Sequence, residues 1–422
     1  MRIQRIKGTN DIFGEEIFYW RFVEETFRKV CESFGAEEMR TPIIEPTELF
    51  VRSVGEETDI VQKEMYTFVD RGGRSVTLRP EGTASLVRAF MENSLVNRGF
   101  PQRFYYVGPM FRYEKPQSGR LRQFHQIGYE CIGSPSPRAD FETILLLNTF
   151  LKEIGLTRHR VYINSIGCPS CRPNYRNALK EYYSFRYEQL CEDCKKRYER
   201  NVLRLLDCKV DAELAKSAPK SVDFLCEECR QHYDELKEYL DSAGIPYVED
   251  HTLVRGLDYY TRTVFEVRHE GLGAQNAIAG GGRYDGLFED LGGPSIPALG
   301  FAGGIERIVL AMREEGILPP KVNPHEVYVV VLGKEAFKVG VELAKKLRER
   351  GVNTEVEIME RNISAQLKNA NRLGARFSII IGESEIARSV VLLRDMASGE
   401  QFEVGIDLAV DRIVDALKTR SS

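Results

Sequence analysis

The spacing of apolar residues changes several times along the chain, and each change marks a predicted element. Between residues 15 and 35 apolar side chains recur mostly three or four positions apart, as one face of an amphipathic helix requires. Gly35 then predicts the end of this helix. Pro42 and Pro46 exclude helix from the next segment and predict an extended one. Helix and strand together are typical either of a dimer surface or of a core-packed helix beside an edge strand.

Residues 103–131 predict an antiparallel hairpin with a long basic loop. An aromatic run favours the first strand, and a polar turn precedes the returning strand. Because side chains two apart in a strand share a face, Gln126, Gly128 and Glu130 should point the same way. An amide, a gap and a carboxylate on one face suit a small polar ligand. An ordinary half-solvated sheet face would show the same pattern.

A second hairpin is predicted over residues 64–79, turning at two glycines and ending in the sequence Arg-Pro-Glu-Gly-Thr. A helix should begin near Thr83. Glu81 therefore lies at a strand-to-helix junction, where the free N–H groups of the first helical turn favour a negative charge. It is either a helix cap or, beside Glu130, part of a ligand site.

The composition changes between residues 167 and 244, which read as helical and charged and hold seven of the nine cysteines. Such a change indicates an inserted domain. Two C-x-x-C pairs can supply four thiolates to a tetrahedral zinc ion, so a zinc site is one interpretation and a reduced cysteine-rich core is the other. The candidate ligands are three such pairs: Cys168, Cys171, Cys191, Cys194, Cys226 and Cys229.

Short strands and glycines return after residue 244. Arg255 precedes an alternating strand, Arg283 follows three glycines, and Arg307 lies in the first turn of a helix after a glycine-rich strand. The glycines lack dinucleotide-binding spacing. From residue 325 onward strands alternate with helices, which predicts a separate α/β domain with a binding role.

Length and composition restrict the function classes. A chain of 422 residues with 42% hydrophobic residues and a net charge of −4 predicts two or three domains with a large core. With no apolar leader and no apolar run of the roughly 18 to 20 residues that span a membrane, we expect a cytoplasmic protein with reduced thiols. The mild acidity argues against coating nucleic acid through bulk charge.

Carboxylates and arginines predict what the main domain binds. Arginine forks match phosphate oxygens and spread negative charge during phosphoryl or adenylyl transfer. Carboxylates beside them suit an ammonium or an imidazole. One nucleotide and one amino acid in a shared site would explain both sets of residues.

Five motifs carry a resemblance over essentially the whole chain. The hairpin with Arg112 resembles motif 2 of class II aminoacyl-tRNA synthetases, and the segment with Arg307 resembles motif 3, while residues 15–46 resemble motif 1. Residues 253–267 and 277–286 resemble two peptides of the histidyl-tRNA synthetase family. The resemblance implies an α+β fold, with a class II antiparallel sheet flanked by helices, a helical cysteine-rich insertion and a C-terminal α/β anticodon-binding domain. The expected divisions are a first catalytic segment with motifs 1 and 2 (1–166), the insertion (167–244), a second catalytic segment with motif 3 (245–320) and the anticodon-binding domain (325–422).

The resemblance also implies an activity and residue roles. It implies a homodimeric enzyme that uses ATP and Mg²⁺ to ligate L-histidine to histidine tRNA through a histidyl-adenylate. Arg112 and Arg255 would act at the ATP α-phosphate, Glu114 at the adenine and Arg307 at the γ-phosphate. The implied histidine pocket comprises Glu81, Gly82, Thr83, Gln126, Gly128, Glu130, Tyr259 and Tyr260. The implied contacts with the tRNA acceptor end are Lys115, Gln117 and Arg120.

An alternative from another class is a regulatory paralogue, a histidine-binding subunit of ATP phosphoribosyltransferase. Such paralogues lack the anticodon domain and often have altered motif arginines. This chain carries residues 325–422 and Arg255.

Overall fold

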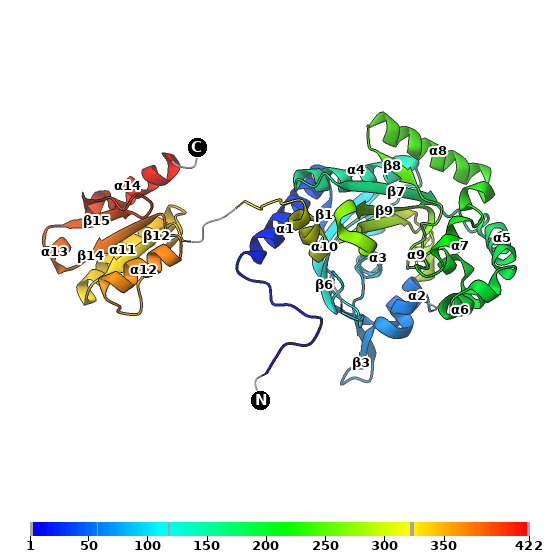
Figure 1. Ribbon diagram of the computed structural model, residues 1–422, viewed down its shortest axis with the longest axis horizontal. Coiled ribbons are helices and arrows are strands. Elements are labelled where there is room, and N and C mark those ends of the chain that lie inside the picture. The colour runs from blue at the N-terminus through cyan, green and yellow to red at the C-terminus, as the bar shows by residue number, and fades with distance from the viewer. Residues whose placement is uncertain (1–2, 57, 117–118, 321–324, 420–422) are drawn as a thin grey trace. The chain divides into compact units, whose positions relative to one another are not determined.

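The computed structural model describes residues 3–56, 58–116, 119–320 and 325–419. The chain forms two compact units, Met1–Pro320 and Lys321–Ser422 (Figure 1). Each unit has a sheet and a hydrophobic core of its own.

An eight-stranded sheet organises the first unit, in the order β1-β5-β6-β11-β10-β9-β7-β8. The pairs β1/β5 and β7/β8 are parallel and the remaining pairs are antiparallel. The predicted antiparallel sheet is therefore confirmed at its centre, with a parallel pair at each edge. Its strands are β1 (Glu37–Glu38), β5 (Gln102–Phe111), β6 (Gln123–Ile132), β7 (His159–Ser165), β8 (Tyr247–Glu249), β9 (Thr261–His269), β10 (Ala277–Arg283) and β11 (Ala298–Gly304).

Three long helices, α1 (Glu16–Ser33), α4 (Pro137–Glu153) and α10 (Ile305–Glu314), contribute to the core that covers one face of this sheet. The predicted amphipathic face of α1 is buried in the core of the same chain through Trp20, Val23 and Phe27. This packing confirms the core-packed interpretation of the helix. On that face of β6, Ile127 and Tyr129 join the core, while Glu130 lies on the other side with Thr83 and Tyr284. The predicted facing of the returning strand is thus confirmed.

The other face of the sheet carries smaller elements. A three-stranded sheet in the order β2-β4-β3 is formed by β2 (Ile44–Pro46), β3 (Tyr66–Val69) and β4 (Ser75–Leu78), next to α2 (Thr47–Val54) and η1 (Ile60–Glu64). Helix α3 (Thr83–Glu92), η2 (Leu95–Arg98) and α9 (Leu287–Asp290) complete this region of the unit. The short η6 (Glu270–Gln275) instead packs against α10 on the first face. The expected hairpin and the helix that begins at Thr83 are both present.

Residues 167–244 are helical as predicted, and α5, α6 and α7 lie together at one side of the first unit (Figure 1). Their apolar residues share one hydrophobic cluster with α3, β5 and the segment around Tyr260. The helical elements are α5 (Arg172–Ser184), η3 (Tyr187–Gln189), α6 (Glu192–Arg200), η4 (Val202–Leu205), α7 (Ala212–Lys216), η5 (Ser221–Phe224) and α8 (Glu227–Ser242).

The second unit contains the predicted α/β alternation. Its sheet runs β13-β12-β14-β15-β16, with β12, β13 and β14 parallel and the last two pairs antiparallel. The elements are β12 (Val327–Val331), α11 (Lys334–Glu349), β13 (Thr354–Val356), α12 (Ile363–Arg372), β14 (Phe377–Ile381), α13 (Glu383–Ala387), β15 (Val390–Asp395), β16 (Gln401–Gly405) and α14 (Ile406–Thr419).

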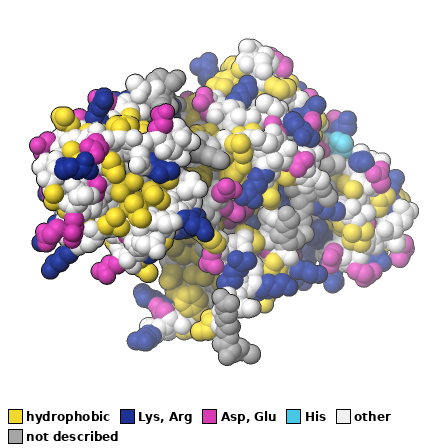
Figure 2. Space-filling model, turned by 60° about the vertical axis from the view of Figure 1, so that its left-hand side comes forward, with side chains coloured by type: hydrophobic (Ala, Val, Ile, Leu, Met, Phe, Trp, Pro, Cys, Tyr) yellow, Lys and Arg dark blue, Asp and Glu magenta, His cyan; other side chains and the backbone are white. Residues whose placement is uncertain are grey.

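Basic and acidic side chains intermingle on the face seen in Figure 2 and are not segregated into fields of one sign. Among the described residues, no helix combines the length and the apolar character that crossing a bilayer demands.

Candidate active site

Glu130 is the most deeply buried carboxylate of the site. It lies on β6, an interior strand of the eight-stranded sheet, with none of its surface exposed. The Thr83 hydroxyl donates to its Oε1 at 2.7 Å, and the Tyr284 hydroxyl donates to its Oε2. Burial raises the pKa of Glu130 to about 8, although both hydroxyl donors oppose the shift. Without a cationic ligand, the protonated carboxyl is therefore favoured at neutral pH.

Glu81 is a helix cap that also belongs to the site. Its carboxylate accepts the backbone N–H of Thr83 at 2.6 Å and that of Ala84 at 2.9 Å, which satisfies free donors at the start of α3. Burial raises the pKa of Glu81, while these two bonds oppose the rise. Thr83 connects the two carboxylates because its N–H binds Glu81 and its hydroxyl binds Glu130.

The ring of Tyr106 explains two predicted glycines. A Cβ atom on Gly128, or one on Gly82, would overlap this ring. The sequence predicted that the space left by the missing side chain of Gly128 holds the substrate. This prediction is wrong, because Tyr106 of the neighbouring strand β5 fills that space. Gly128 therefore shapes the site through Tyr106.

Two further tyrosines and an amide complete the polar lining. The rings of Tyr259 and Tyr260 lie 4.7 Å apart, and Tyr259 lies 5.6 Å from the ring of Tyr284. Gln126 is on the same face of β6 as Glu130, and its amide oxygen is buried without a hydrogen-bond partner among the described residues. An unpaired buried acceptor is costly, so this oxygen is suited to a ligand's donor.

Arg255 lies beside the tyrosines and is held by an acidic residue. Its guanidinium forms an ion pair with Glu266 of β9, and a Cβ on Gly280 would overlap that guanidinium. Glu266 is shared, because its other oxygen accepts Arg268 Nε at 2.6 Å. The Arg255 Nε is buried with no partner among the described residues. The absence of a side chain at Gly280 of β10 thus leaves room for Arg255, whose Nε–H is available to a ligand.

The remaining predicted nucleotide residues gather at the hairpin loop. Arg112 Nε donates to the Pro80 carbonyl at 2.9 Å, and its Nη1 lies 4.0 Å from Glu114 Oε1. Arg120 Nε lies 3.4 Å from Glu114 Oε2. Arg307 Nη1 donates to the Ala277 carbonyl at 2.7 Å, and burial together with the nearby Arg120 lowers its pKa.

The predicted acceptor-end residues are placed unevenly. Lys115 is exposed, Arg120 is paired with Glu114, and Gln117 lies outside the described residues.

Comparison with known proteins decides the family. The family model described as histidyl-tRNA synthetase matches residues 8–308, and the model described as anticodon binding domain matches residues 326–416. The chain belongs to the histidyl-tRNA synthetase family. The family and the class II fold expected from the motifs are confirmed.

Individual relatives of the family support the match over the full length. A histidine–tRNA ligase from Thermotoga petrophila is 68% identical, over 98% of this chain and 99% of its own. The crystal structure of apo S. aureus histidyl-tRNA synthetase has a TM-score of 0.83 at 38% identity, covering 98% of this chain and 100% of its own. A Bacillus halodurans structure titled as an ATP phosphoribosyltransferase regulatory subunit/histidyl-tRNA synthetase has a TM-score of 0.66 at 24% identity, covering 90% and 98%. That last likeness concerns the fold alone.

Three residues of the site escaped the sequence interpretation. Tyr106 was within an aromatic run that only indicated a strand, and Tyr284 followed a glycine run whose interest lay in Arg283. Glu266 alternated with apolar residues as any strand residue does. Only their contacts with Gly128, Glu130 and Arg255 mark these residues as part of the site, and the sequence does not show those contacts.

Arg283 is a structural residue in this member of the histidyl-tRNA synthetase family. It is fully buried, its Nη2 lies 2.7 Å from Asp140 Oδ2, and its Nη1 lies 3.0 Å from Asp285 Oδ1. Nη2 also donates to the carbonyls of Ser134 and Ser136. This network ties β10 to the start of α4.

Two of the three C-x-x-C pairs meet in one group of four thiols, as the zinc interpretation of the sequence requires. This group consists of Cys168, Cys171, Cys226 and Cys229. The remaining pair, Cys191 and Cys194, lies together with two residues that were not among the predicted ligands, Cys208 and Asp211.

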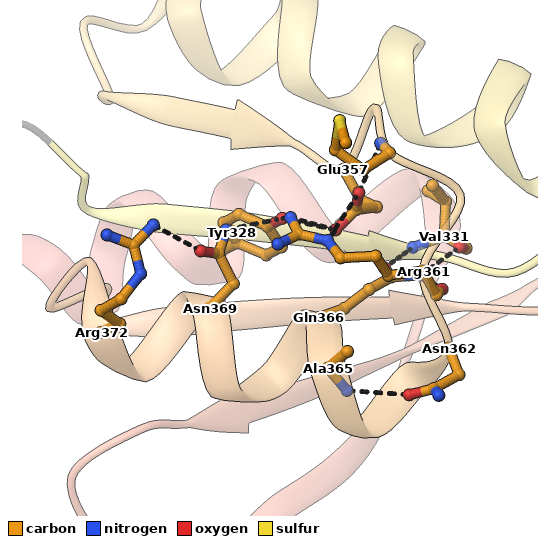
Figure 3. A network of polar contacts seen from close by, with 10 residues as sticks. Tyr328, Val331, Glu357, Arg361, Asn362, Ala365, Gln366, Asn369 and Arg372 are labelled. Carbon is orange, nitrogen blue, oxygen red and sulfur yellow. Dashed lines mark hydrogen bonds and ion pairs between the residues drawn. The ribbon is translucent and has the colours of Figure 1, made fainter.

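The C-terminal unit has a buried polar network of its own (Figure 3). Glu357 accepts the Tyr328 hydroxyl at 2.8 Å and lies 2.7 Å from Arg361 Nη2. Although burial alone would raise it, these contacts hold the pKa of Glu357 below its ordinary value. The Gln366 amide both donates to and accepts from the backbone of Val331 at 2.9 Å. The network fixes the loop after β13 against α12.

Proposed function

We propose that this chain is a histidine–tRNA ligase that forms a histidyl-adenylate and transfers its acyl group to tRNA. The observation that carries the proposal is the pair of buried carboxylates, Glu81 and Glu130, set beside Arg112 and Arg255. The carboxylates match the cationic groups of histidine, and the arginines match phosphate oxygens. Family membership and a 68% identical histidine–tRNA ligase support it.

In the first step, the histidine carboxylate attacks the ATP α-phosphorus in line and pyrophosphate leaves. Arg255 offers its unpaired Nε and Arg112 its guanidinium to the charge that develops at the α-phosphate, while Arg307 binds the γ-phosphate. Glu114, held by Arg112 and Arg120, faces the adenine. Mg²⁺ accompanies ATP and neutralises phosphate charge. The three arginines exchange no proton in this step, and they accelerate it by orienting the substrates and stabilising negative charge.

Specificity for histidine follows from hydroxyl and carboxyl groups in a buried site. Glu130, Thr83 and Tyr284 form a chain of hydrogen bonds that presents polar atoms to an imidazole or ammonium, and Gln126, Tyr259 and Tyr260 complete the pocket. An analogue without ring nitrogens leaves such groups unpaired, which can discriminate by roughly 10⁴ to 10⁵.

For the tRNA, we propose that Lys115, Gln117 and Arg120 contact the acceptor end and that the C-terminal unit binds the anticodon. The match of residues 326–416 to the anticodon binding domain model supports the anticodon role. The loop beside Arg361 exposes 77% of Ile358 and 68% of Met359, and unstacked bases can rest on such side chains.

A homodimer is also proposed, with the segment before and within β2 at its surface. Ile43 and Ile44 are 41% and 51% exposed there, which suits an interface. We place this assembly in the cytoplasm.

The regulatory-subunit alternative is less well supported. The Bacillus halodurans structure that carries this description shares only the fold. This chain has both the matched anticodon-binding unit and the intact arginines Arg112, Arg255 and Arg307.

Pyrophosphate exchange tests the proposal. Purified protein should exchange labelled pyrophosphate into ATP only when histidine is present. Arg255→Ala should lower the exchange rate at least a hundredfold, since removing one preorganised donor typically costs that much, while histidine still binds.

The matched control is Arg160→Ala, because Arg160 pairs with Glu270 at the surface with 60% of its side chain exposed. Exchange with a different amino acid, or no exchange at all, would reject the ligase. Normal exchange by Arg255→Ala would remove Arg255 from the mechanism.

A further inference from the structure

Two groups of metal-ligating side chains lie outside the candidate active site. In the first, Cys168 Sγ lies 3.5 Å from Cys171 Sγ and 3.9 Å from Cys226 Sγ, and Cys229 completes the group. In the second, Cys191 Sγ lies 3.8 Å from Cys208 Sγ, with Cys194 and Asp211. Within each group the ligand atoms all lie within 4.8 Å of one another.

We propose that the segment 167–229 binds two zinc ions, one through four thiolates and one through three thiolates and the Asp211 carboxylate. At a Zn–S distance of about 2.3 Å, two ligands of a tetrahedral site are about 3.8 Å apart, close to the observed sulfur separations. The four thiolates that hold an iron–sulfur cluster are shared among two or more irons, so as a set they stand further apart than the ligands of one ion. Each group is therefore the size of a single-ion site.

Backbone groups already orient both sets of ligands. The Cys226 N–H donates to Cys171 Sγ at 3.1 Å, and the Cys191 N–H donates to Asp211 Oδ2 at 3.1 Å. Cys191 and Cys226 are also the N-cap residues of α6 and α8, so the start of a helix fixes the backbone of one ligand in each group. Such outer contacts are typical of protein metal sites.

The first zinc site adjoins the histidine pocket. Cys168 and Cys171 stand between Gly167 and Arg172. The Gly167 carbonyl accepts the Arg262 N–H at 2.9 Å, and the Arg172 guanidinium donates to the Tyr260 carbonyl. A metal that fixes this turn therefore fixes the backbone of Tyr260.

The second zinc site adjoins Arg255. Cys194 and Cys208 enclose η4, from which Arg204 Nη1 donates to the Arg255 carbonyl at 3.1 Å. Asn201 Nδ2 donates to Asp258 Oδ1 at 3.2 Å in the same stretch. The two metals thus hold the two ends of the segment 255–262, and their ligands act as positioning residues. This positioning role rests on the proposed function, whereas metal binding itself does not.

Metal analysis of full-length protein purified without chelator tests the sites. We expect two zinc ions per chain in the wild type, one in Cys226→Ser and one in Asp211→Asn. Asp211→Cys should restore the second ion. The control Asp193→Asn changes an exposed carboxylate between Cys191 and Cys194 and should keep both ions. Less than one zinc per chain with all seven thiols titratable, iron in place of zinc, or disulfides would overturn the proposal.

Cobalt gives a second measurement that does not depend on how the variants fold. Wild-type protein loaded with two equivalents of Co²⁺ should show thiolate-to-metal charge-transfer bands and tetrahedral d–d bands for both ions. Octahedral spectra without charge transfer would exclude thiolate sites.

Kinetics separate the two positions. In histidine-dependent pyrophosphate exchange, Cys226→Ser should raise the histidine KM about tenfold, because it loosens Tyr260. Asp211→Asn should instead lower kcat about tenfold at nearly constant KM, because it loosens Arg255, and Asp211→Cys should recover it. Identical effects of both variants would overturn the positioning role. Two zinc ions in a protein without histidine-dependent exchange would reject the proposed function and leave the metal sites standing.

Discussion

In the absence of histidine, Glu130→Gln should become increasingly stable relative to the wild type as the pH rises. In the fold the pKa of Glu130 is about 8, against an ordinary value of 4.5. Between these values the native state keeps a proton that the unfolded chain has released. The free energy of unfolding therefore falls as the pH rises through this interval, and the fall ends above the folded pKa.

Linkage gives the size of the effect. From about pH 5 to about pH 9 the buried carboxyl removes about 4 kcal/mol from the free energy of unfolding. Glutamine has nearly the same shape and does not titrate, so the variant loses none of this amount. At roughly 2 °C per kcal/mol for a unit of this size, the Tm difference between variant and wild type should grow by about 8 °C over that range.

The assay is thermal unfolding of both proteins at several pH values without histidine, following the transition of the first unit. Glu315→Gln is a control of opposite sign. Burial alone would raise the pKa of Glu315, but hydrogen bonds from Thr157, Arg158 and His269 hold it at about 2. Its loss should lower the Tm by a nearly constant amount above pH 5. Parallel curves for wild type and Glu130→Gln would refute the reasoning.

Two substitutions test the packing around the site. Gly128→Ala should cost about 1–3 kcal/mol, because its methyl group displaces the Tyr106 ring, and adding Tyr106→Ala should cost less than the sum of both single changes; additive denaturant midpoints would contradict the contact. Arg283→Met should cost about 3–5 kcal/mol, because it leaves the Asp140 carboxylate buried without its guanidinium partner. A urea midpoint within error of the wild type would show that Asp140 is compensated by His232 alone, which lies 3.1 Å away.

Local patterns in the sequence determined much of this protein. The period of apolar residues predicted α1, and an aromatic run with a polar turn predicted the hairpin of β5 and β6, because such signals lie within one element or its turn. Alternation alone placed Glu130 and Gln126 away from the core face that holds Ile127. The motif order indicated the family, since each motif is a continuous segment.

Only the tertiary structure decided which side chains meet. Tyr284 reaches Glu130 across 154 positions of sequence, and Cys208 joins the pair Cys191 and Cys194 and not the pair Cys226 and Cys229. Spacing predicts how residues lie along one element, but contacts between elements depend on how whole surfaces pack. The same rule applies to Gly128, whose missing side chain was evident from the sequence, while the ring of Tyr106 that fills the space was not.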